Sequence, residues 1–282
     1  MTGTEFEIVP ETRVGRVALR VTDIDRTSRF YESVIGLERQ RESGGTVVLG
    51  AGGRPLLELV GDSDASPRTA PETGLFHTAF LVPSRRALAD VLVRIEEEWE
   101  LSGASDHRVS EALYLTDPEG NGVEVYRDRP REGWPTDGDG HVEMDTLPLD
   151  IDELRTESTE EGKVPPETVV GHVHLEVSSI PAARVFYAGT LGLRVRQEFG
   201  PSALFLAADG YHHHVGMNTW NGRSEPATGR GLAWFELVVP DRKSLERIRE
   251  RCIERGIATT PTERGFEVSD TDRITIRLSV ID

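Results

Sequence analysis

The sequence predicts an α+β fold of four successive units, each made of a strand, a helix and about three further strands. One observation is a repeat between the two halves. Gly15-Arg16-Val17 is followed by Phe30-Tyr31 and Gly36-Leu37, and an equivalent set begins at Gly171 at a constant offset (171 − 15 = 156, and 192 − 36 = 156). A second repeat divides each half again, because the run opening at Gly74 matches the run opening at Gly231 (231 − 74 = 157). Fixed offsets of this length indicate a duplicated domain.

The units follow one another in a regular order. The first domain is predicted at 13–128, with units 13–62 and 74–128, and the second at 169–282, with units 169–222 and 230–282. Residues 86–98 place Leu88, Val91, Leu92 and Ile95 on one helical face, and residues 243–255 show a similar pattern. Short apolar or alternating runs, bounded by Gly and Asp-Pro turns, predict the strands that complete each unit.

Residues 129–168 form an acidic connector rich in Pro and Gly. Its apolar residues predict that part of it packs on a domain; these are Leu147, Leu149, Ile151 and Leu154. The single cysteine, Cys252, lies in a helical pattern and is expected to be a buried small hydrophobe, which excludes an internal disulfide.

The amino-acid composition and charge exclude several classes of protein. A net charge of −17 argues against a nucleic-acid partner, because phosphate binding needs a basic surface. No run of about 18 apolar residues predicts a membrane span, and the N-terminus lacks the basic and apolar regions of a secretory signal. We therefore expect a cytoplasmic protein. Lys163 and Lys243 are the only lysines. Such acidity with scarce lysine favours a salt-loving source, the alternative being an acidic enzyme from a high-GC genome.

The fourfold pattern, with Phe-Tyr and Gly-Leu after the opening strands of units one and three, resembles the vicinal oxygen chelate superfamily. That superfamily contains glyoxalase I, bleomycin and fosfomycin resistance proteins, methylmalonyl-CoA epimerase and type I extradiol dioxygenases. Residues 210–214 (Gly-Tyr-His-His-His) and 114–124 are similar to small two-domain catechol 2,3-dioxygenases. The resemblance covers nearly the whole chain outside the connector and implies two half-barrel domains.

Three polar side chains are expected to face one concave surface. Alternation in the strand from Gly171 places His172 and His174 opposite the apolar residues between them. His77 and Glu124 occupy similar positions in two other strands. Two imidazoles and one carboxylate are the ligand set of non-haem Fe(II) oxygen enzymes, and all three residues fall on positions that the superfamily uses for metal. The expected metal is Fe(II), with Mn(II) as an alternative.

The duplication indicates which units share the metal. Arg16 stands where the second half has His172, Trp234 stands where the first half has His77, and residues 273–277 offer no carboxylate to match Glu124. Neither half alone keeps a complete triad. We therefore expect units two and three to pack around one metal, with units one and four as a metal-free pair.

The resemblance also implies the residues around the metal. Tyr114, ten residues before Glu124, matches a tyrosine of catechol-cleaving relatives, and His107 resembles a histidine that binds the substrate hydroxyl. His213 matches the acid–base histidine near O₂, although the register could be off by one. Residues 212–214 are expected on one strand, with His213 facing opposite to its neighbours. His174, His212 and His214 are assigned to substrate binding.

These features imply an Fe(II)-dependent extradiol dioxygenase, an oxidoreductase that inserts both atoms of O₂ into catechol-type aromatic diols. One alternative is another enzyme of the superfamily, either a glyoxalase-like lyase or epimerase or a hydroquinone-cleaving dioxygenase. Glyoxalases and epimerases use paired glutamates, and the missing carboxylate in units three and four counts against them. A non-enzymatic drug-binding resistance protein is the other alternative, against which the intact triad counts. The expected partners are a small aromatic diol and O₂; the oligomeric state, including a homo-oligomer, stays open.

Overall fold

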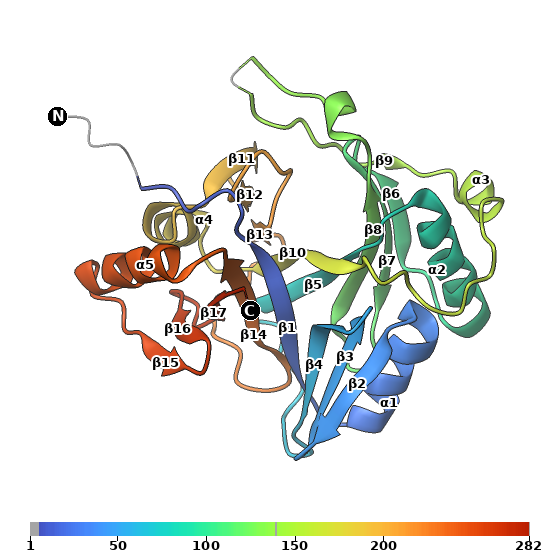
Figure 1. Ribbon diagram of the computed structural model, residues 1–282, viewed down its shortest axis with the longest axis horizontal. Helices are drawn as coiled ribbons and strands as arrows, with labels where there is room; N and C mark the ends of the chain where they lie inside the picture. Colours follow the sequence, from blue (N-terminus) through green and yellow to red (C-terminus); the bar gives the residue numbers. More distant parts are fainter. Residues whose placement is uncertain (1–5, 139, 282) are drawn as a thin grey trace.

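The computed structural model describes residues 6–138 and 140–281, and Figure 1 shows their arrangement. Residues 1–5, on which part of the expectation about a secretory signal rests, lie outside the described residues. The four predicted units appear in chain order and build two large mixed sheets. No helix within the described ranges has the length and apolar character needed to cross a lipid bilayer.

The first half contains units one and two. Unit one comprises β1 (Arg13–Val21), α1 (Ile24–Phe30), the π-helical turn η1 (Tyr31–Ile35), β2 (Glu38–Ser43), β3 (Thr46–Ala51) and β4 (Arg54–Gly61). Unit two comprises β5 (Gly74–Leu81), α2 (Arg85–Glu98), β6 (Gly103–Asp106), β7 (Ser110–Thr116) and β8 (Gly122–Asp128). The connector adds the 3₁₀ turn η2 (Arg131–Gly133), β9 (Leu147–Pro148) and α3 (Ile151–Arg155).

The second half repeats the same order. Unit three comprises β10 (Val169–Glu176), α4 (Ile180–Arg184), the π-helical turn η3 (Val185–Thr190), β11 (Arg194–Phe199), β12 (Ala203–Ala207) and β13 (Val215–Asn218). Unit four comprises β14 (Gly231–Val239), α5 (Arg242–Glu254), β15 (Thr260–Thr262), β16 (Gly265–Ser269) and β17 (Thr275–Val280). Buried Cys252 lies on α5, as expected.

Each sheet takes one unit from each half. Over the described residues, one sheet has the strand order β15-β16-β17-β14-β1-β4-β3-β2, and the other β11-β12-β13-β10-β5-β8-β7-β6-β9. Antiparallel pairing of β1 with β14 joins units one and four, and antiparallel pairing of β5 with β10 joins units two and three. The predicted pairing of units is therefore confirmed.

Helices cover the outer faces of the sheets. In Figure 1, α1 and α2 lie on one side of the molecule, and α4 and α5 on the opposite side. The predicted apolar face of α2 is fully buried, and Leu154 of the connector joins the same core. Val173 and Leu175 of β10 also enter this core, because period-two alternation turns them away from His172 and His174.

The Phe-Tyr pairs of the repeat anchor one unit to the next. The Tyr31 hydroxyl donates a hydrogen bond to Asp117 Oδ2 at 3.0 Å, and the Tyr187 hydroxyl donates to Asp270 Oδ2 at 2.9 Å. Each aspartate lies in the turn that precedes the last strand of the following unit. In the first half this contact fixes the entry into β8, the strand that carries Glu124.

Candidate metal centre and active-site cavity

His77, Glu124 and His172 come together at the centre of the sheet formed by units two and three. They lie on the adjacent strands β5, β8 and β10, and the register places Ala79 of β5 beside both His172 and Glu124. Ala79 is fully buried. Because its side chain is only a methyl group, the longer side chains on the flanking strands can meet above it.

The three side chains converge on one point. Glu124 Oε2 lies 2.9 Å from His77 Nε2 and 3.2 Å from His172 Nε2, and the three candidate ligand atoms all lie within 4.8 Å of one another. His77 Nε2 is buried and makes no hydrogen bond, although the carboxylate oxygen is so close. The atoms are thus at contact distance without the alignment that a hydrogen bond requires. A donor set of two imidazoles and one carboxylate with this geometry fits a divalent first-row metal ion.

Burial acts on His172, and the neighbouring histidines act on Glu124, to hold both groups in the forms that bind metals. It lowers the pKa of His172 to about 4, so the imidazole is neutral at pH 7 and has a free lone pair. Burial opposes ionisation of Glu124, but His172 and His77 outweigh that effect and hold the pKa of its carboxyl well below the usual range. The carboxylate is therefore ionised.

A break in strand register precedes His172. The pairing of β10 with β5 shifts between Val170 and His172, and Gly171 stands at this irregularity. A Cβ atom at residue 171 would lie 1.8 Å from the Tyr126 hydroxyl, so only glycine fits there. A bulge changes the direction of the side chains that follow it, and here the following side chain is that of His172.

The convergent residues open into a cavity of about 340 Å³. Its apolar wall consists of Phe76, Met144, Phe199, Phe205 and Trp220. Phe199 and Trp220 are each 52% exposed, so they lie where the cavity meets solvent. Among the described residues that line the cavity, none is Lys or Arg.

His107 and Tyr114 form a polar pair in the cavity wall. His107 Nδ1 lies 2.6 Å from the Asp145 carbonyl oxygen, and His107 Nε2 lies 2.6 Å from the Tyr114 hydroxyl. A carbonyl oxygen only accepts, so His107 Nδ1 carries the hydrogen. With its hydrogen at Nδ1, the His107 ring accepts at Nε2 from the Tyr114 hydroxyl. Burial raises the pKa of Tyr114 well above its usual value, with Glu124 adding to the effect, so the phenol keeps its proton.

His174 lines the cavity but is engaged by Asn218. Asn218 Oδ1 accepts from the Trp220 backbone N–H at 3.1 Å, which turns Asn218 Nδ2 toward His174 Nε2, also at 3.1 Å. His174 Nε2 therefore accepts this bond and is not free to bind a metal. Burial lowers the pKa of His174 well below its usual value.

The expectation that residues 212–214 form a strand is wrong, because β13 begins only at Val215. The three histidines lie in the bend before it, where Asp209 Oδ1 accepts the Tyr211 backbone N–H at 2.8 Å. Of the three, only His213 lines the cavity. His212 packs against Tyr211, and His214 Nδ1 accepts from the Ala208 backbone N–H at 3.2 Å. The structure does not bring His212 and His214, which we assigned to substrate binding, to the cavity wall.

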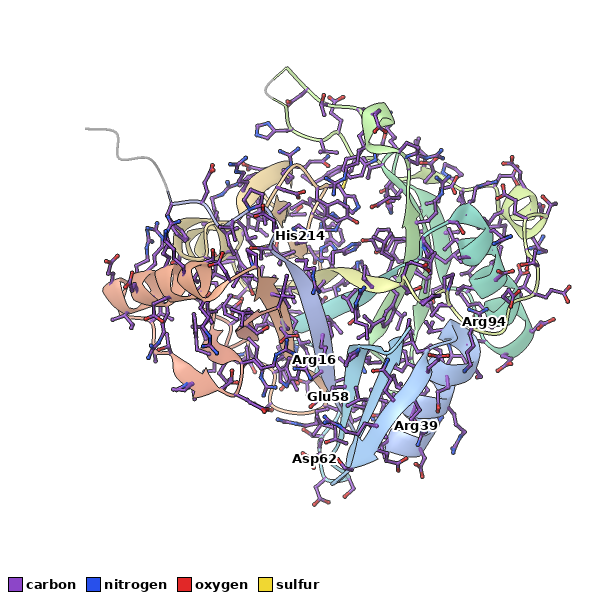
Figure 2. All side chains as sticks on the ribbon, viewed as in Figure 1. Arg16, Arg39, Glu58, Asp62, Arg94 and His214 are labelled. Atoms are coloured by element: carbon purple, nitrogen blue, oxygen red, sulfur yellow. The ribbon has the colours of Figure 1, made fainter. Side chains whose placement is uncertain are left out.

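The sheet of units one and four has an aromatic and basic cluster at the matching positions. The Arg16 and Arg277 guanidinium groups lie 5.3 Å and 3.9 Å from the centre of the Trp234 ring. Arg16 also lies 3.5 Å from Glu58 and 3.4 Å from Glu236. Figure 2 labels Arg16 and Glu58 together, well apart from His214. Ion pairs and cation–π contacts thus occupy the positions that correspond to the candidate metal ligands of the other sheet.

Several residues of the cavity region were not predicted from the sequence. Ala79 and Asn218 position the histidines, the connector supplies the Asp145 carbonyl, and Asp128 contacts His212. Alternation along β8 from Glu124 through Tyr126 could have identified Asp128 as facing the same side. A backbone carbonyl leaves no such signal in the sequence.

Comparison with known proteins agrees with this architecture. Residues 13–125 and 169–278 match the model of the Glyoxalase/Bleomycin resistance protein/Dioxygenase superfamily. A Bacillus subtilis (strain 168) protein named catechol-2,3-dioxygenase is 38% identical over 269 residues, which cover 92% of this chain and 94% of that protein.

Solved structures share the fold at low sequence identity. A candidate dioxygenase from Bacillus subtilis has a TM-score of 0.69 at 14% identity, covering 98% of this chain and 86% of that one. Glyoxalase I from Zea mays has a TM-score of 0.60 at 15% identity, covering 96% of this chain and 92% of that one. At such identities the similarity concerns the fold alone.

Proposed function

The chain belongs to the Glyoxalase/Bleomycin resistance protein/Dioxygenase superfamily, and on that premise we propose that it is an Fe(II)-dependent extradiol dioxygenase that opens catechol-type rings with O₂. The relative of 38% identity that bears the name catechol-2,3-dioxygenase supports a dioxygenase. The observation that carries the finer proposal is the set of two histidines and one glutamate beside a mostly apolar cavity.

His77, Glu124 and His172 would hold the metal. When bound, Fe(II) would supply Lewis acidity toward the two diol oxygens and the one-electron chemistry that O₂ requires. Mn(II) could take the same ligands, because carboxylate and imidazole donors accept both ions.

The cavity would orient the diol with its hydroxyl edge toward the triad. Phe76, Phe205 and Trp220 would contact the ring and its apolar substituents. Since the Tyr114 hydroxyl donates a hydrogen bond to His107, its phenolic oxygen keeps lone pairs that can accept a hydrogen bond from a substrate hydroxyl. This pair would position the diol before the ring is attacked.

His213 would move the proton. Burial lowers the pKa of His213 well below its usual value, so the imidazole is neutral and able to accept a hydroxyl proton. The overall reaction would break the ring bond beside the two hydroxyls and place both oxygen atoms of O₂ in a semialdehyde acid. His213 would later return the proton it had taken.

The test is turnover of catechol by protein loaded anaerobically with Fe(II) and then exposed to O₂. We expect a yellow ring-opened product. His213→Asn should lower kcat by about 10²- to 10⁴-fold with the iron content unchanged, because its role is proton transfer. Glu124→Gln should lose the iron in addition to the activity. Parallel assays with Mn(II) in place of Fe(II) compare the two metals.

Other outcomes would replace the proposal. If iron-loaded protein turned over neither catechols nor hydroquinones but did convert a methylglyoxal–thiol adduct, the chain would be a glyoxalase-like lyase. Cleavage of hydroquinones alone would change the substrate class. Tight binding of an aromatic drug without metal or turnover would favour a resistance protein.

A further inference from the structure

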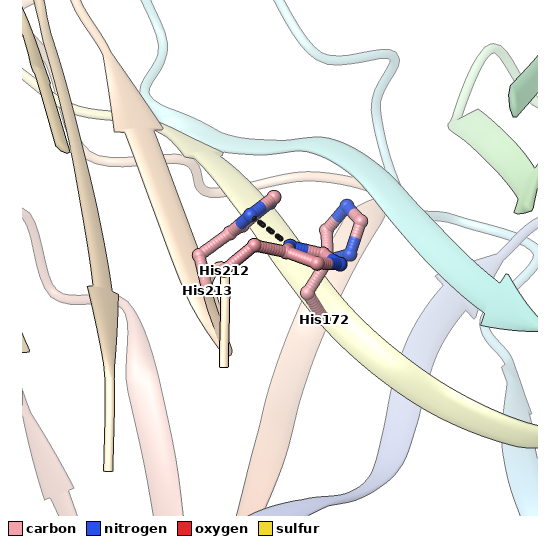
Figure 3. Close-up of side chains that lie close together, drawn as sticks. All are labelled: His172, His212 and His213. Carbon is pink, nitrogen blue, oxygen red and sulfur yellow. Dashed lines mark hydrogen bonds between the residues drawn. The ribbon is translucent and has the colours of Figure 1, made fainter. Parts of the chain in front are cut away.

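His213 is connected to the surface by a line of polar groups behind the cavity. His213 Nδ1 lies 2.7 Å from His212 Nδ1, the contact that Figure 3 marks with a dashed line. On the other side of the His212 ring, Nε2 lies 3.1 Å from Asp128 Oδ1. Asp128 ends β8 and is 25% exposed at its side chain, whereas His212 is 1% exposed.

With His212 carrying a single ring hydrogen, the donors and acceptors along this line set the hydrogen positions. A carboxylate only accepts, so His212 Nε2 carries the hydrogen that Asp128 receives. A neutral imidazole has one N–H, which leaves His212 Nδ1 as an acceptor. His213 Nδ1 must then donate to it. The remaining ring nitrogen of His213, Nε2, is therefore without hydrogen and is the one available to a ligand in the cavity.

Aromatic packing holds the middle of this line in place. The rings of Tyr211 and Trp134 lie 4.0 Å and 5.4 Å from the His212 ring. The Tyr211 hydroxyl lies 3.3 Å from the same Asp128 oxygen and 2.7 Å from the Tyr126 hydroxyl. With His212 packed in this way, the imidazole has little freedom to rotate and change its partners.

We propose that Asp128, acting through His212, is a positioning residue that holds His213 in the tautomer with Nε2 facing the cavity as a hydrogen-bond acceptor. This inference rests on the proposed function for its catalytic consequence. It does not rest on that function for the tautomer itself. An orienting carboxylate of this kind affects rate strongly, because the wrong tautomer presents an N–H where the reaction needs a lone pair.

The histidines of this line could instead bind a metal ion, which would require a different arrangement of ring hydrogens. Ligand atoms of His172, His212 and His213 also lie within 4.8 Å of one another, and His172 Nδ1 has no hydrogen-bond partner. A metal bound through Nδ1 of both His212 and His213 would require both of these nitrogens to be bare. The hydrogen-bonded arrangement requires one of them to carry a hydrogen.

The kinetic test compares Asp128→Asn with the iron-loaded wild type. We expect kcat to fall on the order of 10- to 100-fold while KM stays within about threefold and the iron content is unchanged. Asp128→Glu should recover part of the rate, because it restores a carboxylate. Asp137→Asn is the matched control, since Asp137 pairs with His141 at 3.1 Å outside the cavity, and it should leave kcat unchanged.

The spectroscopic test reads the tautomer directly. Nitrogen NMR of histidine-labelled, Zn(II)-loaded wild type should show His213 protonated at Nδ1 and His212 protonated at Nε2, and Asp128→Asn should mix these forms. A wild type with His213 protonated at Nε2, or an Asp128→Asn spectrum unchanged from it, would overturn the proposal. So would metal-bound signals from Nδ1 of both residues. A protein inactive toward catechol with the expected tautomers would instead remove the proposed function alone.

Discussion

The buried carboxyl of Asp270 makes the free energy of unfolding depend on pH in a direction unusual for an aspartate. Asp270 is 8% exposed in the turn before β17, and burial raises its pKa from 3.8 to about 6. Backbone N–H groups of Asp272 and Ile274 donate to Oδ1, and the Tyr187 hydroxyl donates to Oδ2. These bonds favour the carboxylate but do not offset its loss of hydration.

The shift in the pKa of Asp270 determines the size and the sign of its contribution to the unfolding free energy. A folded-state pKa above the unfolded value means that the folded protein binds the proton more tightly, so this group stabilises the fold below about pH 4. That stability is lost as pH rises through about 6. A shift of about 2 units corresponds to about 3 kcal/mol. Asp270→Asn carries no titrating carboxyl, so its unfolding free energy relative to wild type should rise by about 2 kcal/mol between pH 4 and pH 7.

The assay is urea unfolding of both proteins at several pH values, analysed by linear extrapolation. The difference between the two curves isolates this group from the other carboxylates. Tyr187→Phe removes a hydrogen bond that lowers the pKa of Asp270, and should therefore extend the sloping region to higher pH. A difference between wild type and Asp270→Asn that stayed flat from pH 4 to pH 7 would refute the reasoning.

Three further predictions concern the two sheets and the surface charge. Ala79→Leu should weaken metal binding about 10- to 100-fold, because the larger side chain separates His172 from Glu124. Competition with a chelator measures the affinity, and an unchanged value would contradict this prediction. Trp234→Ala should lower the unfolding free energy by about 3–5 kcal/mol and leave metal affinity intact, since Trp234 packs in the other sheet; loss of metal would contradict that separation. If the charge of −17 is an adaptation to salt, the midpoint of urea unfolding should rise markedly from dilute buffer to molar KCl. A constant midpoint would leave only codon bias to explain the scarce lysine.

The parts predicted well from the sequence are those that strand periodicity and duplication determine. His172 and His174 face the cavity, and Val173 and Leu175 face the core, because β10 is a regular strand between two neighbours. The contrast between His172 and Arg16 identified which units pair, since a duplicated fold keeps equivalent positions even where the residues diverge.

The parts that could not be predicted depend on irregular backbone and on contacts between distant segments. His212 and His214 lie in a bend fixed by Asp209, and alternation does not apply outside a strand. The wall formed by the connector at Asp145 depends on how a long loop folds back beside β6 and His107, which no local pattern records.

The joining of each sheet from both halves also affects how the chain folds during synthesis. While only the first half has left the ribosome, β1 and β5 are paired along one edge, and their other edges must wait for β14 and β10. Open strand edges accept any matching strand, including the same strand of a second copy. Two chains that exchanged their second halves would satisfy every pairing in both sheets. A higher concentration of chains during folding would therefore favour such an exchange.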